Sequence, residues 1–127
     1  MQRGKILLID DNEQDLNLTS ELLEKVGYTV VKNSGWLGTT NNIKFANPDL
    51  VLLDINMPAL TGDKLYDLIN SHVKNRGIPV LFYSSLDESS LRTLKIKKGA
   101  TDYIVKGDIF QLYRKISSYM KKKSFSN

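Results

Sequence analysis

Short uninterrupted runs of apolar residues recur along the chain and alternate with longer amphipathic segments. The clearest runs are Lys5–Ile9 and Leu50–Leu53. Such a run predicts a strand that is covered on both faces, because a strand with one solvent-exposed face alternates apolar and polar residues. Three further runs predict strands at Tyr28–Val31, Val80–Tyr83 and Tyr103–Val105.

The segments between these strands have apolar residues at helical spacing. Helices are predicted at Glu13–Val26, Thr61–Lys74, in a segment that ends at Gly99, and from Ile109 to about Lys122. Thr61 is the expected cap of the second of these helices. Its buried face should include Leu65, Leu68, Ile69 and Val73, and that of the last helix Ile109, Leu112, Ile116 and Tyr119 or Met120. Residues 36–47 are rich in Gly, Thr and Asn, so a helix there should be short or irregular.

Five strands alternating with five helices predict a three-layer α/β fold with right-handed crossovers. No repeat, linker or low-complexity tract divides the chain. We therefore expect one domain over residues 1–123, followed by a frayed tail at residues 124–127. All five strands should end at the same edge of a parallel sheet.

Composition narrows the possible functions. The chain has 127 residues and no Cys, which excludes disulfides and zinc-thiolate sites and is compatible with a cytoplasmic protein. No apolar run approaches the ~20 residues of a membrane span, so no membrane insertion is expected. Residues 1–63 carry five basic and nine acidic side chains, whereas residues 64–127 carry thirteen and five. These basic residues are most simply a solvated surface, and an acidic protein partner is the alternative.

Polar residues stand where the predicted strands end, and they should converge at one edge of the sheet. They are Asp10, Asp11, Asp54, Ser84 and Lys106. Three neighbouring carboxylates repel one another, and one ammonium neutralises only one of them. A Mg²⁺ ion fits the remainder. Its expected ligands are Asp11 and Asp54 directly, Asp10 through water, and the backbone carbonyl of Asn56.

A metal ion, an ammonium and a hydroxyl around a carboxylate can bind a tetrahedral oxyanion. Phosphoryl transfer requires mainly positioning and charge neutralisation from a protein, so Asp54 could act as the nucleophile. Mg²⁺ and Lys106 would balance the phosphoryl oxygens, and Ser84 would donate a hydrogen bond to one of them. Ser84 could instead be only the N-cap of the following helix.

Four motifs at these strand ends resemble the receiver domain of two-component response regulators. They are Ile9-Asp10-Asp11-Asn12, the stretch Asp49 to Pro58 with Thr61-Gly62, the stretch Pro79 to Ser84, and the stretch Gly99 to Lys106. The resemblance covers the whole chain. It implies a flavodoxin-like (βα)5 fold with the strand order 2-1-3-4-5.

The same resemblance implies a function. Asp54 would accept a phosphoryl group from the phosphohistidine of a sensor histidine kinase or a histidine phosphotransfer protein, in a Mg²⁺-dependent reaction. Ser84 and Tyr103 would be the switch pair that remodels the face made by the helix ending at Gly99, the strand at residues 103–105 and the last helix. That face would contact a downstream protein target. The domain would catalyse only its own phosphorylation and dephosphorylation.

Gly107 departs from the family pattern, in which proline usually follows the lysine. We therefore expect a trans or a strained peptide bond after Lys106. An unphosphorylated receiver-like scaffold is one alternative function. A haloacid-dehalogenase-type phosphatase is a weaker one, because Asn56 replaces the second carboxylate that this chemistry needs. Direct DNA binding is not expected, since no helix-turn-helix segment is found in the sequence.

Overall fold

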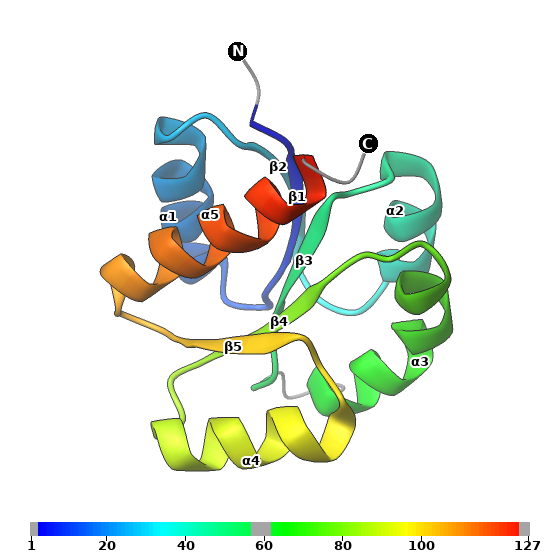
Figure 1. Ribbon diagram of the computed structural model, residues 1–127, viewed down its shortest axis with the longest axis vertical. Coiled ribbons are helices and arrows are strands. Elements are labelled where there is room, and N and C mark those ends of the chain that lie inside the picture. Colours follow the sequence, from blue (N-terminus) through cyan, green and yellow to red (C-terminus); the bar gives the residue numbers. More distant parts are fainter. Residues whose placement is uncertain (1–2, 57–61, 125–127) are drawn as a thin grey trace.

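The computed structural model describes residues 3–56 and 62–124, and within these ranges strands and helices alternate along the chain (Figure 1). The strands are β1 (Lys5–Ile9), β2 (Thr29–Asn33), β3 (Leu50–Asp54), β4 (Val80–Ser84) and β5 (Asp102–Val105). The helices are α1 (Glu13–Lys25), α2 (Thr39–Ala46), α3 (Gly62–Asn75), α4 (Glu88–Lys98) and α5 (Ile109–Ser124). Each predicted element is present. None of the helices in the described ranges is long and apolar enough to cross a membrane.

The strands form one parallel sheet in the order β2-β1-β3-β4-β5, as the family resemblance implied. The centre of the sheet is the β1–β3 pair, in which Ile9 lies opposite Leu53. Asp10 and Asp54 directly follow these two residues in sequence. This register therefore brings the two carboxylates together.

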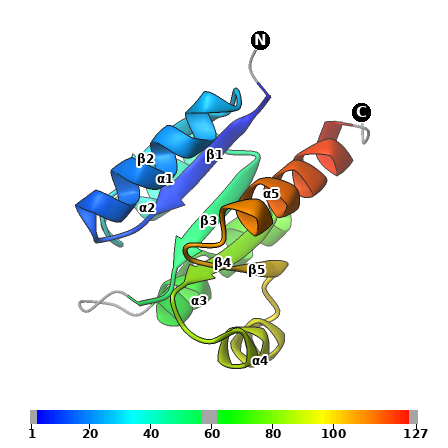
Figure 2. The same cartoon turned by 90° about the vertical axis from the view of Figure 1, so that its left-hand side faces the viewer.

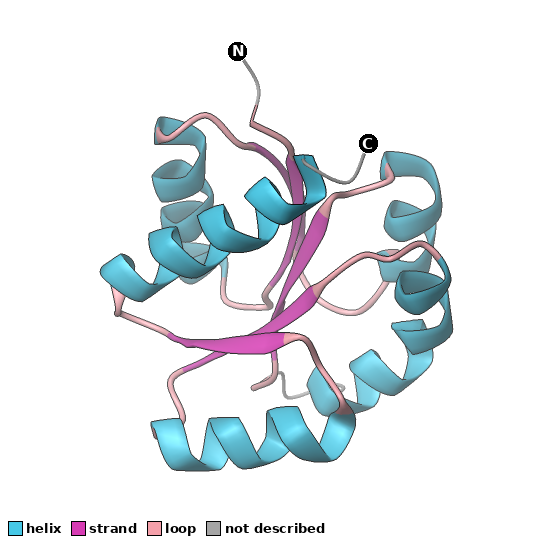
Figure 3. Ribbon diagram, in the orientation of Figure 1, coloured by secondary structure: helices cyan, strands magenta, loops and turns pink. Residues whose placement is uncertain are grey.

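Helices cover both faces of the sheet, which makes the predicted three layers (Figures 2 and 3). α1 and α5 pack on one face, and α2, α3 and α4 on the other. β3 supplies both cores, because successive side chains of a strand point to opposite faces. Leu50 and Leu52 pack with α1 and α5, whereas Val51 and Leu53 pack with the other three helices.

Polar side chains stabilise the start of α1 and the end of α2. The side chain of Asn12 caps α1 by accepting a hydrogen bond from the backbone of Asp15 at 3.0 Å. α2 has only eight residues and begins after Gly38, whose φ of 80° lies in the left-handed region, without a side-chain cap. Arg76 donates hydrogen bonds to the carbonyls of Ile43 and Lys44, which stabilises the other end of α2. The prediction of a short second helix is confirmed.

The buried faces of α3 and α5 are narrower than predicted. In α5, Leu112, Ile116 and Met120 are buried, but the side chain of Ile109 is 48 % exposed. In α3, Leu68 is 59 % exposed. Ile109 is in the first turn of α5, and Leu68 lies where the buried side of α3 meets its exposed side. Apolar spacing alone therefore overestimated the burial of both residues. The predicted Thr61 cap lies outside the described residues.

Candidate functional site

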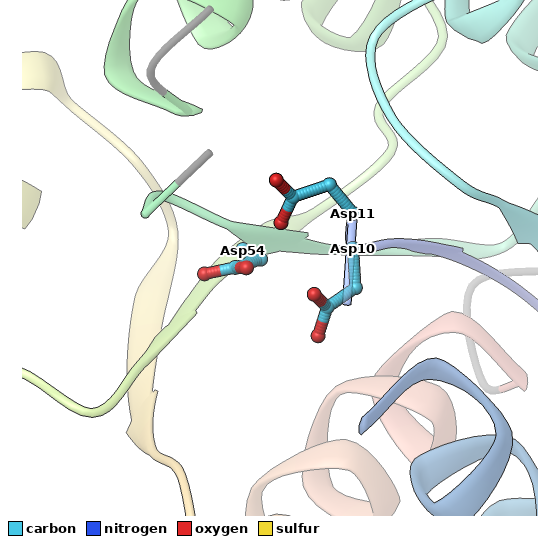
Figure 4. Close-up of side chains that lie close together, drawn as sticks. All are labelled: Asp10, Asp11 and Asp54. Atoms are coloured by element: carbon cyan, nitrogen blue, oxygen red, sulfur yellow. The ribbon is translucent and has the colours of Figure 1, made fainter. Parts of the chain in front are cut away.

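Three carboxylates meet at the carboxyl ends of β1 and β3 (Figure 4). Asp10 and Asp11 follow β1, and Asp54 is the last residue of β3. One oxygen atom from each of the three side chains lies within 4.8 Å of the others. The predicted convergence of these residues is therefore observed.

The two inner carboxylates are almost fully buried and are oriented by the backbone. Asp10 is 0 % and Asp54 is 2 % exposed. Oδ1 of Asp10 accepts a hydrogen bond from the backbone N–H of Asn12, and Oδ1 of Asp54 accepts one from that of Asn56, both at 3.0 Å. Each carboxylate is thus fixed by the turn that follows its own strand, and its second oxygen faces the site.

Burial raises the pKa of Asp54 from its ordinary value of 3.8 to about 6. The hydrogen bond from the Asn56 backbone opposes this shift, and the neighbouring Asp10 carboxylate adds to it. The Lys106 ammonium lowers the pKa of Asp54, but it does not cancel the cost of placing this charge in a buried site. The ionised form of Asp54 consequently lacks sufficient positive charge around it.

Lys106, which follows β5, supplies an ammonium group to the cluster. Its Nζ lies 2.9 Å from Oδ2 of Asp10 and 3.5 Å from Oδ2 of Asp54. Burial disfavours the ammonium, but its hydrogen bond to Asp10 and the charge of Asp54 together raise the pKa of Lys106. This side chain therefore stays charged and holds positive charge next to Asp54.

The backbone after Lys106 takes the first of the two forms expected from Gly107. The described residues contain no cis peptide bond, so the Lys106–Gly107 bond is trans. Gly107 has a φ of 92°, a conformation that side-chain-bearing residues rarely adopt. A trans bond with glycine in this turn still directs Lys106 into the acidic cluster.

Ser84 ends β4 beside the cluster and is fully buried. Its Oγ lies 3.1 Å from the backbone nitrogen of Leu86 and 3.4 Å from Nδ2 of Asn56, both of which donate to it. The N-cap of α4 is Asp87, so the interpretation of Ser84 as that cap is wrong. In both of these contacts, Oγ of Ser84 is the acceptor.

Tyr103 lies in β5, where its ring is buried and its hydroxyl reaches α4. The hydroxyl donates to Oε1 of Glu88 at 2.9 Å and accepts a weaker hydrogen bond from Arg92 at 3.4 Å. Nζ of Lys115 lies 4.0 Å from the centre of the ring, which favours this position through a cation–π contact. Tyr103 thus connects β5, α4 and α5.

A fourth carboxylate, Asp15, was not predicted from the sequence. It lies in the first turn of α1, and its Oδ2 is 3.0 Å from Nζ of Lys106. An acidic residue in the first turn of a helix is ordinarily explained by the helix dipole, so the position of Asp15 did not indicate a role in the site. Its spacing from Thr19, a buried residue one turn later, places it on the inward side of α1 and is the signal that could have revealed it.

The donor set of the cluster suits a hard divalent cation. Asp10, Asp11 and Asp54 supply carboxylate oxygens at short mutual distances, and the surplus of negative charge favours a cation. Lys106 is the only basic side chain within salt-bridge distance of Asp54 among the described residues. Mg²⁺ matches these oxygen ligands and a partly open position.

Comparison with curated proteins shows relatives with different architectures. The chain is 33 % identical over 118 residues to the CAI-1 autoinducer sensor kinase/phosphatase CqsS of Vibrio cholerae, matching 91 % of this chain and 17 % of that protein. It is 33 % identical over 106 residues to the probable transcriptional regulator ycf27 of Porphyridium aerugineum, matching 84 % and 43 %. The chain thus spans less than half of either protein. It is 28 % identical to protein PilH of Pseudomonas aeruginosa, of which it covers 85 %.

Solved structures share the fold. The chemotaxis protein CheY4 of Vibrio cholerae superposes with a TM-score of 0.81 at 21 % identity, over 91 % of this chain and 98 % of that one. A two-component response regulator from Clostridium difficile gives a TM-score of 0.82 at 21 % identity, over 94 % and 97 %. The family model of the response regulator receiver domain matches residues 6–117. The sheet order 2-1-3-4-5 and the acidic cluster agree with this match. The chain therefore belongs to the response regulator receiver domain family.

Proposed function

We propose that Asp54 accepts a phosphoryl group from the phosphohistidine of a sensor histidine kinase or a histidine phosphotransfer protein. The observation that carries this proposal is the position of Asp54 in a receiver domain, buried between two carboxylates and the Lys106 ammonium. The absence of cysteine is compatible with the cytoplasm, the location that we propose.

In the proposed reaction an oxygen of Asp54 attacks phosphorus while the P–N bond to the histidine breaks. The electron pair of that bond stays on the imidazole nitrogen, and the product on Asp54 is an acyl phosphate. Lys106 neutralises charge on the phosphoryl oxygens, and the Ser84 hydroxyl donates to one of them. A bound Mg²⁺, held by Asp10, Asp11, Asp54 and the carbonyl of Asn56, would supply further charge neutralisation.

We further propose that phosphorylation alters the face formed by α4, β5 and α5. Ser84 belongs to β4, and the backbone of Lys106 donates to its carbonyl at 2.7 Å. A movement of Ser84 toward a phosphoryl group would therefore be felt at the end of β5. Tyr103, whose hydroxyl is held by Glu88 in this structure, would then turn inward and release its contact with α4. A downstream protein would bind the altered face.

The test uses a small phosphodonor. Purified protein is incubated with acetyl phosphate and Mg²⁺, and its intact mass is measured over time. The wild type should gain the mass of one phosphoryl group, and excess chelator should prevent this gain. Asp54→Ala should gain none, because the nucleophile is absent. Asp67→Ala is the matched control, since it removes a carboxylate from an exposed pair with Lys98 and should label like the wild type.

Two outcomes would contradict the proposal. If the wild type gains no mass under conditions in which another receiver domain is labelled, the unphosphorylated scaffold is favoured. Steady hydrolysis of a phosphate ester would favour the phosphatase. The phosphatase is disfavoured because Asn56 is an amide and cannot act as the general acid and base that this chemistry takes from a second carboxylate.

A further inference from the structure

We propose that Asp15 is a positioning residue, which holds the ammonium of Lys106 beside Asp54 during phosphoryl transfer. This proposal rests on the proposed function of Asp54. It concerns a side chain outside the four family motifs, and it assigns a role in the site to the first turn of α1.

The contacts of Lys106 are the first support. A lysine ammonium has three donor hydrogens and no acceptor. Three carboxylates surround Nζ: Asp10 at 2.9 Å, Asp15 at 3.0 Å and Asp54 at 3.5 Å. Two short contacts therefore fix the group, and the longest is directed at the proposed nucleophile. A phosphoryl oxygen next to Asp54 would then meet the Lys106 ammonium, which Asp10 and Asp15 already hold in place.

The N-terminus of α1 leaves the Asp15 carboxylate available for this contact. In a capping box, the third helical residue would bind the backbone N–H of the cap residue. Here that N–H, from Asn12, donates to Asp10, and the Asn12 side chain caps the backbone of Asp15. The Asp15 side chain is thus not used by its own helix end, and its Oδ2 accepts from Lys106.

The two anchors of Lys106 differ in their other duties. Asp10 belongs to the carboxylate cluster that suits a cation, so its oxygens are shared between that role and Lys106. Asp15 is not part of that cluster. It can therefore keep Lys106 in place when Asp10 serves as a metal ligand. The ring of Tyr83 lies 5.5 Å from Nζ and adds a cation–π contact to the two carboxylates that hold the ammonium.

The ordinary explanation for Asp15 is a favourable charge at a helix N-terminus. Glu13 provides the matched control, because it is the other acidic residue of the first turn of α1 and it is exposed. No salt bridge joins Glu13 to Lys106 within the described part of the chain. Removing either carboxylate takes the same charge from the same helix end, but only Asp15 contacts the ammonium.

The experiment measures the rate of labelling by acetyl phosphate at saturating Mg²⁺ as the phosphodonor concentration is varied. Asp15→Ala should lower the maximal rate about three- to tenfold with little change in the half-saturating concentration, because a charged group at the reacting centre is less well placed. Asp15→Asn, which keeps an acceptor oxygen, should recover most of the rate. Glu13→Ala should label like the wild type.

A double-mutant cycle identifies the route of the effect. If Asp15 acts through Lys106, Asp15→Ala should have no further effect in a Lys106→Ala background. Faster labelling of Asp15→Ala, equal losses in Asp15→Ala and Glu13→Ala, or full additivity with Lys106→Ala would each overturn the proposal. Failure of the proposed function is distinguishable, because the wild type itself would then not label.

Discussion

Two buried clusters of charge lie on the strands of the same sheet, and they are balanced differently. At the carboxyl ends of β1 and β3, burial raises the pKa of Asp54 to about 6. At the start of β5, Asp102 is also partly buried, and burial alone would raise its pKa. Hydrogen bonds from Tyr119 and the Tyr103 backbone, together with the contact with Lys115, reverse that effect and lower the pKa of Asp102.

The difference lies in the number of donors for each carboxylate. Asp102 has an ammonium at 3.0 Å from Lys115 and a phenol at 2.7 Å from Tyr119, both from α5. In the acidic site, Lys106 is the one ammonium that the described residues place against Asp10, Asp15 and Asp54, and Asp10 and Asp54 each accept one backbone hydrogen bond besides. Asp102 has enough hydrogen-bond donors, and it joins β5 to α5. Asp54 has too few, so its surroundings favour an additional positive charge. The deeper burial of Asp54 and its smaller number of donors together distinguish the acidic site from the Asp102 cluster.

The largest expected effect comes from breaking the balanced cluster. Asp102→Ala leaves Lys115 and Tyr119 without their shared acceptor, and we expect a loss of about 2 to 3 kcal/mol in the free energy of unfolding. Urea denaturation of the metal-free protein measures it. Asp67→Ala, which breaks the more exposed pair with Lys98, should cost less than about 1 kcal/mol. Equal losses in the two variants would show that Asp102 is an ordinary surface charge.

The opposite sign is expected at Asp54. A raised pKa means that the folded protein binds this proton more tightly than the unfolded chain, so the fold loses stability as the pH rises from about 4 to about 6, and the full penalty of the ionised Asp54 is present above that. Asp54→Asn removes that charge and keeps an acceptor for the Asn56 backbone. We expect it to stabilise the metal-free protein by about 1 to 2 kcal/mol at pH 8, less than the full 1.36 kcal/mol per pKa unit because Lys106 loses a partner.

The control for this gain is Asp54→Asn at a pH well below 4, where the carboxyl is mostly protonated in both states and the substitution should have little effect. A destabilised variant at pH 8 would show that Lys106 compensates the charge of Asp54 fully. Asp54 would then have no surplus of negative charge around it, and it would not differ from Asp102 in this respect.

The sequence predicted the framework of the acidic site and its surplus of negative charge, but not every contact within it. Apolar runs located β1 and β3, and the parallel fold placed Asp10 and Asp54 at a common edge, because that step depends only on topology. Asp15 was missed because its partner, Lys106, is 91 residues away in sequence. The Asp102 cluster was missed for the same reason, since periodicity assigns Tyr119 to a helix face without naming its acceptor. Spacing of apolar residues also overestimated the burial of Ile109.

The smallest expected effect, and the one that separates the two clusters most directly, is their dependence on pH. The lowered pKa of Asp102 gives a stabilisation that is complete above the unfolded-state value near 4 and is lost as the pH falls below that value through the lower pKa of the folded state. The raised pKa of Asp54 gives a penalty that is absent at low pH and grows between about pH 4 and 6.

Urea denaturation of the wild type, Asp102→Asn and Asp54→Asn at several pH values tests this difference. Below about pH 4 the stability difference between the wild type and Asp102→Asn should shrink by up to about 1 kcal/mol, since this carboxylate is partly exposed and solvent screens it. The advantage of Asp54→Asn should grow as the pH rises from about 4 to about 6 and stay constant at higher pH. Parallel curves for both variants would mean that the two carboxylates experience the same field, and the surplus of charge at Asp54 would then no longer distinguish a site for a cation and a phosphoryl group from a structural ion pair.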